Sequence, residues 1–181
     1  MIKYQYEPYF LTFTVVDWLD VFGRKHCRDI VIDSLKYCIK HKGLILYGYV
    51  IMPNHMHLVA QAAEGSSGLS GLIRDFKRHT SKQITLWMLG SQKESRRSWM
   101  LDIFKRNANN TYRNETFQVW KHGSKPKHLF NREIFEQKLH YTHMNPVKAG
   151  IVRLSQDYLY SSAGTYAGRD DNIMEVTIAN S

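Results

Sequence analysis

The sequence predicts an α+β fold of the ferredoxin-like (RRM-like) type, in which helices pack against an antiparallel sheet. Segments with strand patterning and segments with helical spacing follow each other in the order strand, helix, strand, strand, helix. The two middle strands form a hairpin, which favours an antiparallel sheet over a doubly wound parallel one. Because 181 residues fit one domain, we expect residues 1–181 to form a single unit.

The first element is a strand over residues 9–16, which are rich in aromatic and β-branched side chains. Alternation divides them between two faces, with Phe10 and Thr12 on one and Leu11, Phe13 and Val15 on the other. A helix is predicted over residues 24–42, where apolar residues recur at helical spacing, and Gly43 ends it.

The hairpin and a second helix come next. Residues 44–52 predict a buried strand, Pro53 and Asn54 a turn, and residues 55–62 the strand that pairs back. Over residues 69–88, apolar residues mark one helical face, and basic residues crowd the remainder. This helix is therefore expected to be amphipathic and basic.

The C-terminal half is less regular. Residues 90–116 are polar and rich in charge and Asn, which is typical of a variable insertion, and the pattern predicts no structure for them. A short strand is expected near residues 116–120. A last helix, capped by Asn131, is predicted to run toward Asn145 and to end at Pro146.

The composition narrows the class of protein. A hydrophobic fraction of 43% excludes a disordered chain, and 25 Lys+Arg against 16 Asp+Glu give a net charge of +9. Such a surplus predicts a polyanionic partner, with nucleic acid as the first choice. We expect a cytoplasmic protein with no membrane partner, because residues 1–10 do not resemble a signal peptide and the longest apolar run, 44–52, is short. Cys27 and Cys38 belong to no zinc motif and are expected to be free, buried thiols.

Two histidines suggest a metal site. His55 and His57 are one residue apart in a strand, so both leave the same face while Met56 points to the other. Two imidazoles so placed can chelate one ion. Taken alone, the pair is more typical of two histidines on a half-exposed strand face than of a metal site.

Tyr141 and Asn145 stand one turn apart on the last helix, roughly opposite Phe135 and Leu139, which are expected to face the core. An amide oxygen is a hard neutral ligand, so two His and one Asn suit Mg²⁺ or Mn²⁺ better than zinc. The phenol of Tyr141 could then reach a phosphorus held by the metal. The alternative is a packing tyrosine whose hydroxyl is satisfied by water.

Two longer segments make a family resemblance specific. Gly48–Val59 (GYVIMPNHMHLV) resembles the His-hydrophobic-His segment of IS200-like transposases, the single-tyrosine (Y1) branch of the HUH endonucleases. Tyr141–Val152 (YTHMNPVKAGIV) resembles their tyrosine helix in the form typical of REP-associated tyrosine transposases. Residues 72–81 and the Tyr-x-x-Ser-Ser segment at 158–162 agree with the basic helix and C-terminal region of that family.

The resemblance implies a site and a reaction. The family nucleophile falls on Tyr141, and the ligands of the divalent ion fall on His55, His57 and Asn145. Attack by the tyrosine on single-stranded DNA would leave a 5′-phosphotyrosine link and a free 3′-hydroxyl, which can later rejoin strands without ATP. The implied partner is single-stranded DNA folded into a hairpin, and some relatives act as homodimers. Lys138 and Lys148 lie near the tyrosine in sequence as possible aids to its deprotonation, and nothing in the sequence selects either.

Several basic residues are candidates for phosphate contacts, against the alternative of a solvated surface. They are Arg74, Lys77, Arg78 and Lys82 on the second helix, and Lys125 and Lys127 before the tyrosine helix. The pairs Arg96-Arg97 and Lys105-Arg106 in the insertion could extend this surface or merely keep a loop soluble.

Other functions remain open at this point. A non-catalytic module could bind single-stranded nucleic acid through its sheet. A metal-dependent hydrolase would need carboxylates, and neither motif contains Asp or Glu. Inside the family, a domesticated enzyme could act on dispersed REP-type palindromes. Tyr158, Tyr160 and Tyr166 are rival nucleophiles, but none has an amide residue one turn later.

Overall fold

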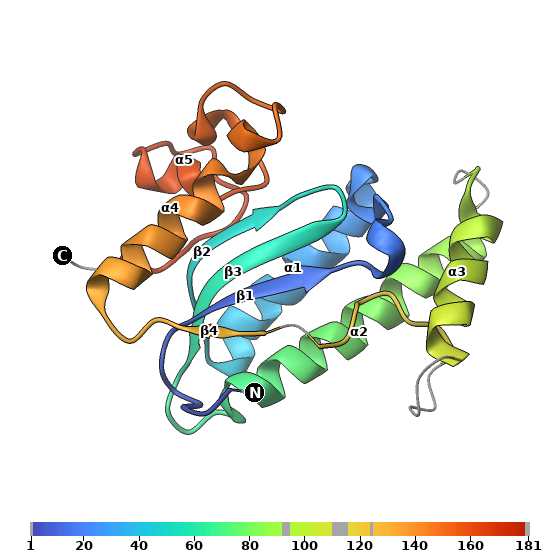
Figure 1. Ribbon diagram of the computed structural model, residues 1–181, viewed down its shortest axis with the longest axis horizontal. Coiled ribbons are helices and arrows are strands. Elements are labelled where there is room, and N and C mark those ends of the chain that lie inside the picture. The colour runs from blue at the N-terminus through green and yellow to red at the C-terminus, as the bar shows by residue number, and fades with distance from the viewer. Residues whose placement is uncertain (1, 92–94, 110–115, 124, 180–181) are drawn as a thin grey trace.

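The computed structural model describes residues 2–91, 95–109, 116–123 and 125–179, and it is built on one antiparallel sheet (Figure 1). The strand order is β2-β3-β1-β4. The strands are β1 (Tyr9–Thr14), β2 (Leu44–Ile51), β3 (His55–Ala62) and β4 (Lys127–His128). This order, with a helix after β1 and another after β3, is the ferredoxin-like arrangement, so the predicted fold class is confirmed.

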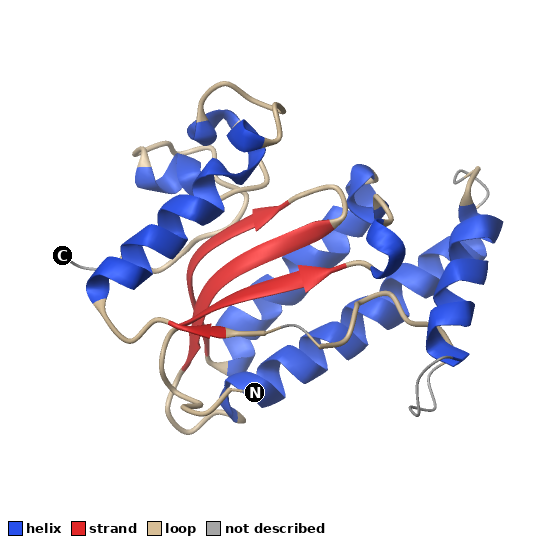
Figure 2. Ribbon diagram, in the orientation of Figure 1, coloured by secondary structure: helices blue, strands red, loops and turns tan. Residues whose placement is uncertain are grey.

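The helices α1 (Lys25–Lys42) and α2 (Gly68–Gly90) pack side by side against one face of the sheet, as Figure 2 shows. Between them and the sheet lies the main hydrophobic core. Leu11 and Phe13 of β1 and Met56 and Leu58 of β3 enter this core, as the alternation of each strand requires. Gly43, at φ +73°, ends α1 in the left-handed conformation.

The opposite face of the sheet is covered in part by α4 (Arg132–Lys148), which packs over β2 and β3. A small second cluster lies beneath it, formed by Phe10, Val59 and Leu129 with Tyr47, Ile134, Phe135, Leu139 and Tyr141. Gly48 on β2 permits the close approach, because a Cβ at this position would collide with the side chain of Leu139.

Helix α4 begins as predicted but ends later. The side chain of Asn131 accepts a hydrogen bond from the backbone N–H of Ile134 at 2.9 Å, which confirms the cap. The prediction that Pro146 ends the helix is wrong, because Pro146 lies inside the last turn and is buried. A proline disrupts the hydrogen bonding of the helical turn before it. Because Pro146 lies so close to the end of α4, this disruption affects only the end of the helix. Gly150, at φ +70°, then lets the chain leave.

The predicted strand at residues 116–120 is also wrong. Only Trp120 makes an isolated bridge, to Val15 at the end of β1, and the N–H of Gln118 is donated to the carbonyl of Phe104. The fourth strand lies further on, where Lys127 pairs with Phe10. The segment thus bonds partly to a partner helix and only at its end to the sheet, and local patterning does not record such a partner.

That partner helix is α3 (Arg97–Asn109), which occupies the described part of the predicted insertion. It contacts α2 and lies beside the turn η1 (Val16–Trp18) that follows β1 (Figure 1). The short turn η2 (Val21–Gly23) comes next along the chain. Residues 92–94 and 110–115 of the predicted insertion lie outside the described residues.

The C-terminal segment contains η3 (Ser155–Asp157) and α5 (Ala163–Tyr166) and returns to β2. The hydroxyl of Tyr158 donates to the carbonyl of Ile51 at 2.8 Å, and that of Tyr166 to the carbonyl of Tyr47 at 2.8 Å. These tyrosines therefore hold the C-terminal segment on the sheet. Among the described residues, no helix combines the length and the apolar character needed to cross a bilayer.

Candidate active site

The two histidines predicted to share a face do so. His55 and His57 leave β3 on the side of α4, with ring centroids 5.0 Å apart, and Met56 is fully buried on the other side. In the register of the sheet, His57 lies opposite Thr12 and His55 opposite Thr14. The alternation of one strand is thus sufficient to form the pair.

Each histidine has a polar partner at Nδ1. The Oγ1 of Thr12 lies 2.9 Å from Nδ1 of His57, and the Oδ1 of Asn54 lies 2.7 Å from Nδ1 of His55. An amide oxygen only accepts, so Nδ1 of His55 carries the proton and donates it to Asn54. The Nε2 of a neutral His55 is then left with a lone pair, which is the form that a metal ion binds.

Burial keeps both rings neutral. Burial first, and then the nearby charges of His55 and Lys138, lower the pKa of His57 to about 3. Burial also lowers the pKa of His55. Neutral imidazoles can coordinate a cation without first losing a proton.

The predicted amide residue reaches the same site from α4. The Oδ1 of Asn145 lies 3.4 Å from Nε2 of His55. With the proton of His55 on Nδ1, two acceptor atoms face each other across this distance. Ligands of an octahedral ion at about 2.1 Å lie about 3 Å apart, so a small cation between these two atoms would fit.

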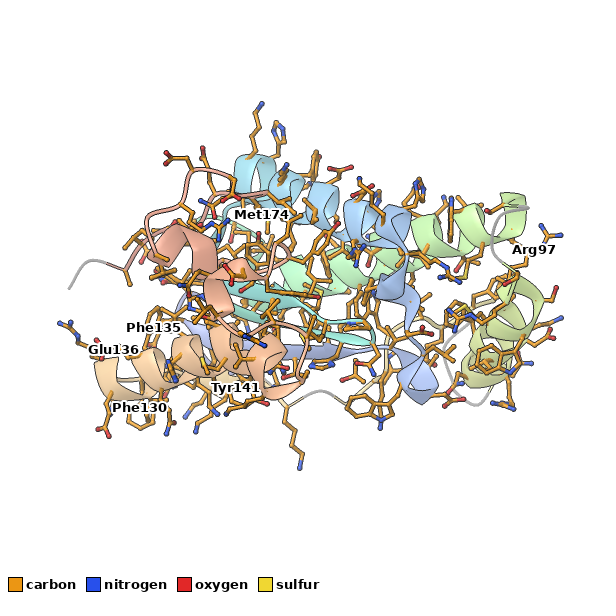
Figure 3. All side chains as sticks on the ribbon, turned by 90° about the horizontal axis from the view of Figure 1, so that it is seen from above. Arg97, Phe130, Phe135, Glu136, Tyr141 and Met174 are labelled. Atoms are coloured by element: carbon orange, nitrogen blue, oxygen red, sulfur yellow. The ribbon has the colours of Figure 1, made fainter. Side chains whose placement is uncertain are left out.

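Tyr141 completes the site. Its ring lies edge-on to His57 with centroids 5.4 Å apart, and edge-on to Phe10 at 5.7 Å. Figure 3 shows Phe135 and Tyr141 on the same helix, far from Arg97 of α3. Phe135 and Leu139 face the core as predicted, but Tyr141 packs against the same second cluster and does not face away from it. A helix that lies over a sheet buries a broad face, and these residues lie toward the two sides of that face.

The centre of that face is formed by Thr142 and Pro146, the two buried residues of α4. His143 is a packing histidine. Its Nε2 lies 2.8 Å from the hydroxyl of Ser162, and its ring packs on Tyr166. It lies outside the cluster of His57, Tyr141 and Asn145.

Two lysines flank the tyrosine. The Nζ atoms of Lys138 and Lys148 lie 5.1 and 5.2 Å from the centroid of the Tyr141 ring, and Lys138 also lies 5.2 Å from the centroid of Phe10. Burial lowers the pKa of Lys138, and the charge of Lys127 on β4 lowers it further. The sequence placed both lysines near the tyrosine without selecting either. Their spacing of three and seven residues from Tyr141 puts them on one helical face.

The basic residues of α2 line a groove of about 1110 Å³ between this helix and residues 116–126. Its basic members are the four that the sequence proposed, Arg74, Lys77, Arg78 and Lys82. Arg74 and Arg78 both pair with Asp75 on their own helix and stay exposed. The groove also touches Thr12, the partner of His57, but its lining includes none of His55, His57, Tyr141 and Asn145.

The other basic candidates lie near the opposite wall. Lys127 belongs to β4, and Lys125 is exposed in the segment before it. One residue from each basic pair of the insertion makes an ion pair within the protein. Arg96 pairs with Asp20 at 2.8 Å, and Arg106 pairs with Asp17 at 3.0 Å.

Within the described ranges, no group of three or more His, Cys, Asp or Glu is placed to hold a metal ion. A site made of imidazole and carboxylate ligands, or of Cys and His as for structural zinc, is therefore not found there. Cys27 and Cys38 are buried and free, as expected. The set of two histidines and one asparagine is the candidate that the described residues offer.

Among the comparisons with known proteins, the one with solved structures found a match. No family model and no curated protein matches the sequence. A solved structure, that of a REP-associated tyrosine transposase bound to a REP hairpin, is similar to this chain with a TM-score of 0.60 and 16% identity. The match covers 100% of this chain and 93% of that one. It supports the resemblance read from the two motifs, and the chain shares its fold with a tyrosine transposase.

Proposed function

We propose that this protein is a metal-dependent tyrosine transposase or endonuclease that cleaves and rejoins single-stranded DNA at hairpin sites. One observation carries the proposal. Tyr141 on α4 lies beside His57 on β3, while Asn145 of the same helix reaches His55. A tyrosine, two neutral imidazoles and an amide oxygen thus meet in one place, and the sequence motifs that supply them are those of the Y1 family.

The reaction assigned to Tyr141 is an in-line attack of its phenolate oxygen on a phosphodiester phosphorus. The bond from phosphorus to the phenolic oxygen forms, and the bond from phosphorus to the 3′-oxygen breaks. The 3′-oxygen takes up a proton and leaves as a hydroxyl. Because the ester to tyrosine preserves the bond energy, a 3′-hydroxyl can later reverse the step and rejoin strands.

The ion would be held by Nε2 of His55, Nε2 of His57 and Oδ1 of Asn145. When bound, a divalent cation neutralises charge on the phosphoryl oxygens and orients the phosphate. The side chains of Thr12 and Asn54 orient the two rings toward it, as outer-shell partners do in metal sites. Mg²⁺ and Mn²⁺ are the ions that this donor set suits.

The two lysines beside Tyr141 supply fixed positive charge where the DNA phosphate must lie. Lys138 is partly desolvated and close to Lys127, so an incoming phosphate relieves the repulsion between these two ammonium groups. Lys148 flanks the same ring. We assign to Lys138 and Lys148 the task of holding the backbone of the strand against the nucleophile.

The substrate class follows from charge and from the structural neighbour. The net charge of +9 and the basic groove along α2 suit a nucleic acid. The neighbour with the same fold was solved bound to a REP hairpin. We therefore propose hairpin DNA with single-stranded flanks, and the α2 groove as the surface that contacts its phosphates.

The test is covalent capture. Labelled hairpin oligonucleotides from the flanks of the gene are incubated with the protein and Mg²⁺ or Mn²⁺, then run on a denaturing gel. A DNA-protein adduct is expected from the wild type and is expected to be absent from Tyr141→Phe and His57→Ala. Tyr37→Phe, which changes an exposed tyrosine on α1, serves as the matched control and should keep the adduct.

Two outcomes would count against the proposal. An adduct that persists in Tyr141→Phe would move the nucleophile to another residue. Tight binding of hairpins without any adduct would instead favour the non-catalytic binding module.

A further inference from the structure

The turn η1, directly after β1, has an unusual backbone. Asp17 and Trp18 adopt φ values of 49° and 56°, and no other non-glycine residue in the described part of the chain has a positive φ. Side chains with a Cβ are strained in this conformation, which persists only where surrounding contacts hold it. Two such residues in succession indicate that specific contacts hold the turn in this conformation and that the conformation serves a function.

The backbone of the turn is held from two sides. The N–H of Val15 donates to the carbonyl of Asn54 at 3.0 Å, and the N–H of Val16 donates to the carbonyl of Val119 at 2.9 Å. Asn54 immediately precedes His55 and also accepts the hydrogen bond from its ring. The turn is therefore tied directly to the residue that orients a proposed metal ligand.

The side chain of Asp17 is held from a third side by α3. The guanidinium of Arg106 lies 3.0 Å from Oδ2 of Asp17, and the amide of Asn107 donates to the same oxygen at 3.4 Å. These contacts come from the predicted insertion. The insertion thus contributes a contact that holds the strained residue in place.

The result is an exposed indole at the edge of the site. The side chain of Trp18 is 59% exposed, and its ring lies 6.0 Å from that of His55 at an angle of 73°. A large flat apolar side chain is kept in solvent beside a proposed metal ligand, on a backbone that the fold constrains at three points. An exposed aromatic face in such a setting suits a nucleobase, because every base has a flat π-face that stacks on indole.

We propose that Trp18 is a stacking platform for an unpaired nucleobase next to the phosphodiester presented to Tyr141, an inference that rests on the proposed function. Base stacking on Trp18 would fix the rotation of the strand, while the lysines beside Tyr141 hold its phosphates. Since stacking tolerates any base, the platform serves to position the strand more than to select its sequence. The grip of α3 on Asp17 keeps the indole at the site.

The test distinguishes contacts to the bases from contacts to the phosphates. The first probe is a labelled single strand of about twelve deoxythymidines, and the second is a strand of equal length made of abasic nucleotides. Binding is measured by fluorescence anisotropy without divalent ions and on the Tyr141→Phe background, so that no cleavage occurs. A failure to form the covalent adduct, which would sink the proposed function, therefore leaves this measurement readable.

Trp18→Ala is expected to weaken binding of the deoxythymidine strand about 10-fold and to leave binding of the abasic strand unchanged. Trp18→Phe should restore most of the loss, because it keeps a flat ring. Trp99→Ala, which removes a comparably exposed tryptophan on α3 at 53% exposure, is the matched control and should bind like the parent. Thermal unfolding of each variant checks that the fold is retained.

Three results overturn the inference. One is an equal loss on both probes, which would make Trp18 a structural residue. Another is no loss on either probe. The third is a parent protein that binds both probes equally well or does not bind the deoxythymidine strand, since no base would then be stacked. A second variant, Asp17→Asn, tests the role of α3: it removes the ion pair, keeps a residue that tolerates positive φ, and should weaken only the deoxythymidine probe.

Discussion

Oδ1 of Asn145 lies 3.4 Å from Nε2 of His55, although 90 positions separate the two residues in the chain. The contact joins the last turn of a helix to the first residue of a strand. Because the ring proton of His55 is on Nδ1 and is donated to Asn54, neither Nε2 of His55 nor Oδ1 of Asn145 has a proton to donate. Two half-buried acceptors in contact are unfavourable unless a cation or a donor lies between them.

Replacing Asn145 should therefore weaken metal binding. Loss of an outer-shell partner alone costs about 10- to 100-fold in affinity, so Asn145→Ala, which removes a ligand, should cost about 10-fold or more. Asn145→Asp keeps the shape and adds a negative charge, and should bind Mn²⁺ at least as tightly as the wild type. Isothermal titration with Mn²⁺ measures both. Unchanged affinity in Asn145→Ala would remove this residue from the ligand set.

Thr12 offers a second test of the site, because its hydroxyl is the partner of Nδ1 of His57. Thr12→Val keeps the shape and removes the hydrogen bond, so Mn²⁺ affinity should fall about 10- to 100-fold. Thr12→Ser should retain most of it. Thr14 is on the same strand as Thr12 and lies opposite His55 of β3, so Thr14→Val is the matched control. A loss of equal size in the Thr14 variant would point to a general effect on β1.

Removing the positive charge beside Tyr141 should slow adduct formation. Lys138→Ala and Lys148→Ala are each expected to reduce the rate by about 10-fold, since a charge-assisted contact contributes about 1.5–3 kcal/mol. The salt dependence of binding should also become shallower by about one unit of log-log slope for each lysine that contacts a phosphate. Lys36→Ala, on the exposed surface of α1, is the control. Rates and salt slopes that match the wild type would show that these lysines do not contact DNA.

The close packing of α4 on β2 can be tested at Gly48. A larger residue there meets the side chain of Leu139, so Gly48→Val should destabilise the protein by about 1–3 kcal/mol. It should also reduce adduct formation, because α4 carries Tyr141. The thermal midpoint and the adduct rate are measured together. Leu139→Ala removes the side chain that a Cβ at position 48 would meet. The double variant with Gly48→Ala and Leu139→Ala should therefore lose less stability than the sum of the losses in the two single variants.

Much of the fold was predictable because it follows from local periodicity. The alternation of residues 9–16 and 55–62 assigned each side chain to the correct face, including Thr12 and His57. Asn131 and Gly43 marked helix ends through cap chemistry that involves only a few neighbours. Local rules act on local structure, so these predictions were confirmed.

The predictions that failed involve contacts across the fold. Pro146 is accommodated in the last turn of α4, where it is buried. Residues 116–120 make one isolated bridge to the end of β1, while the N–H of Gln118 donates to the carbonyl of Phe104 in α3. The position of β4 depends on where that segment next reaches β1. Each of these outcomes depends on a partner that the local pattern does not name.

The candidate site also combines features that follow from local periodicity with features that depend on contacts across the fold. The sequence by itself determined that His55 and His57 share a face and that Asn145 follows Tyr141 by one turn, because each pair lies within one element of known period. Only the tertiary structure decided that α4 would lie on β2 over Gly48, so that Tyr141 meets His57 and Asn145 meets His55. It also decided that α3 would grip Asp17 and hold Trp18 beside the site. Periodicity fixes directions within an element, whereas the distance between elements depends on how their side chains pack.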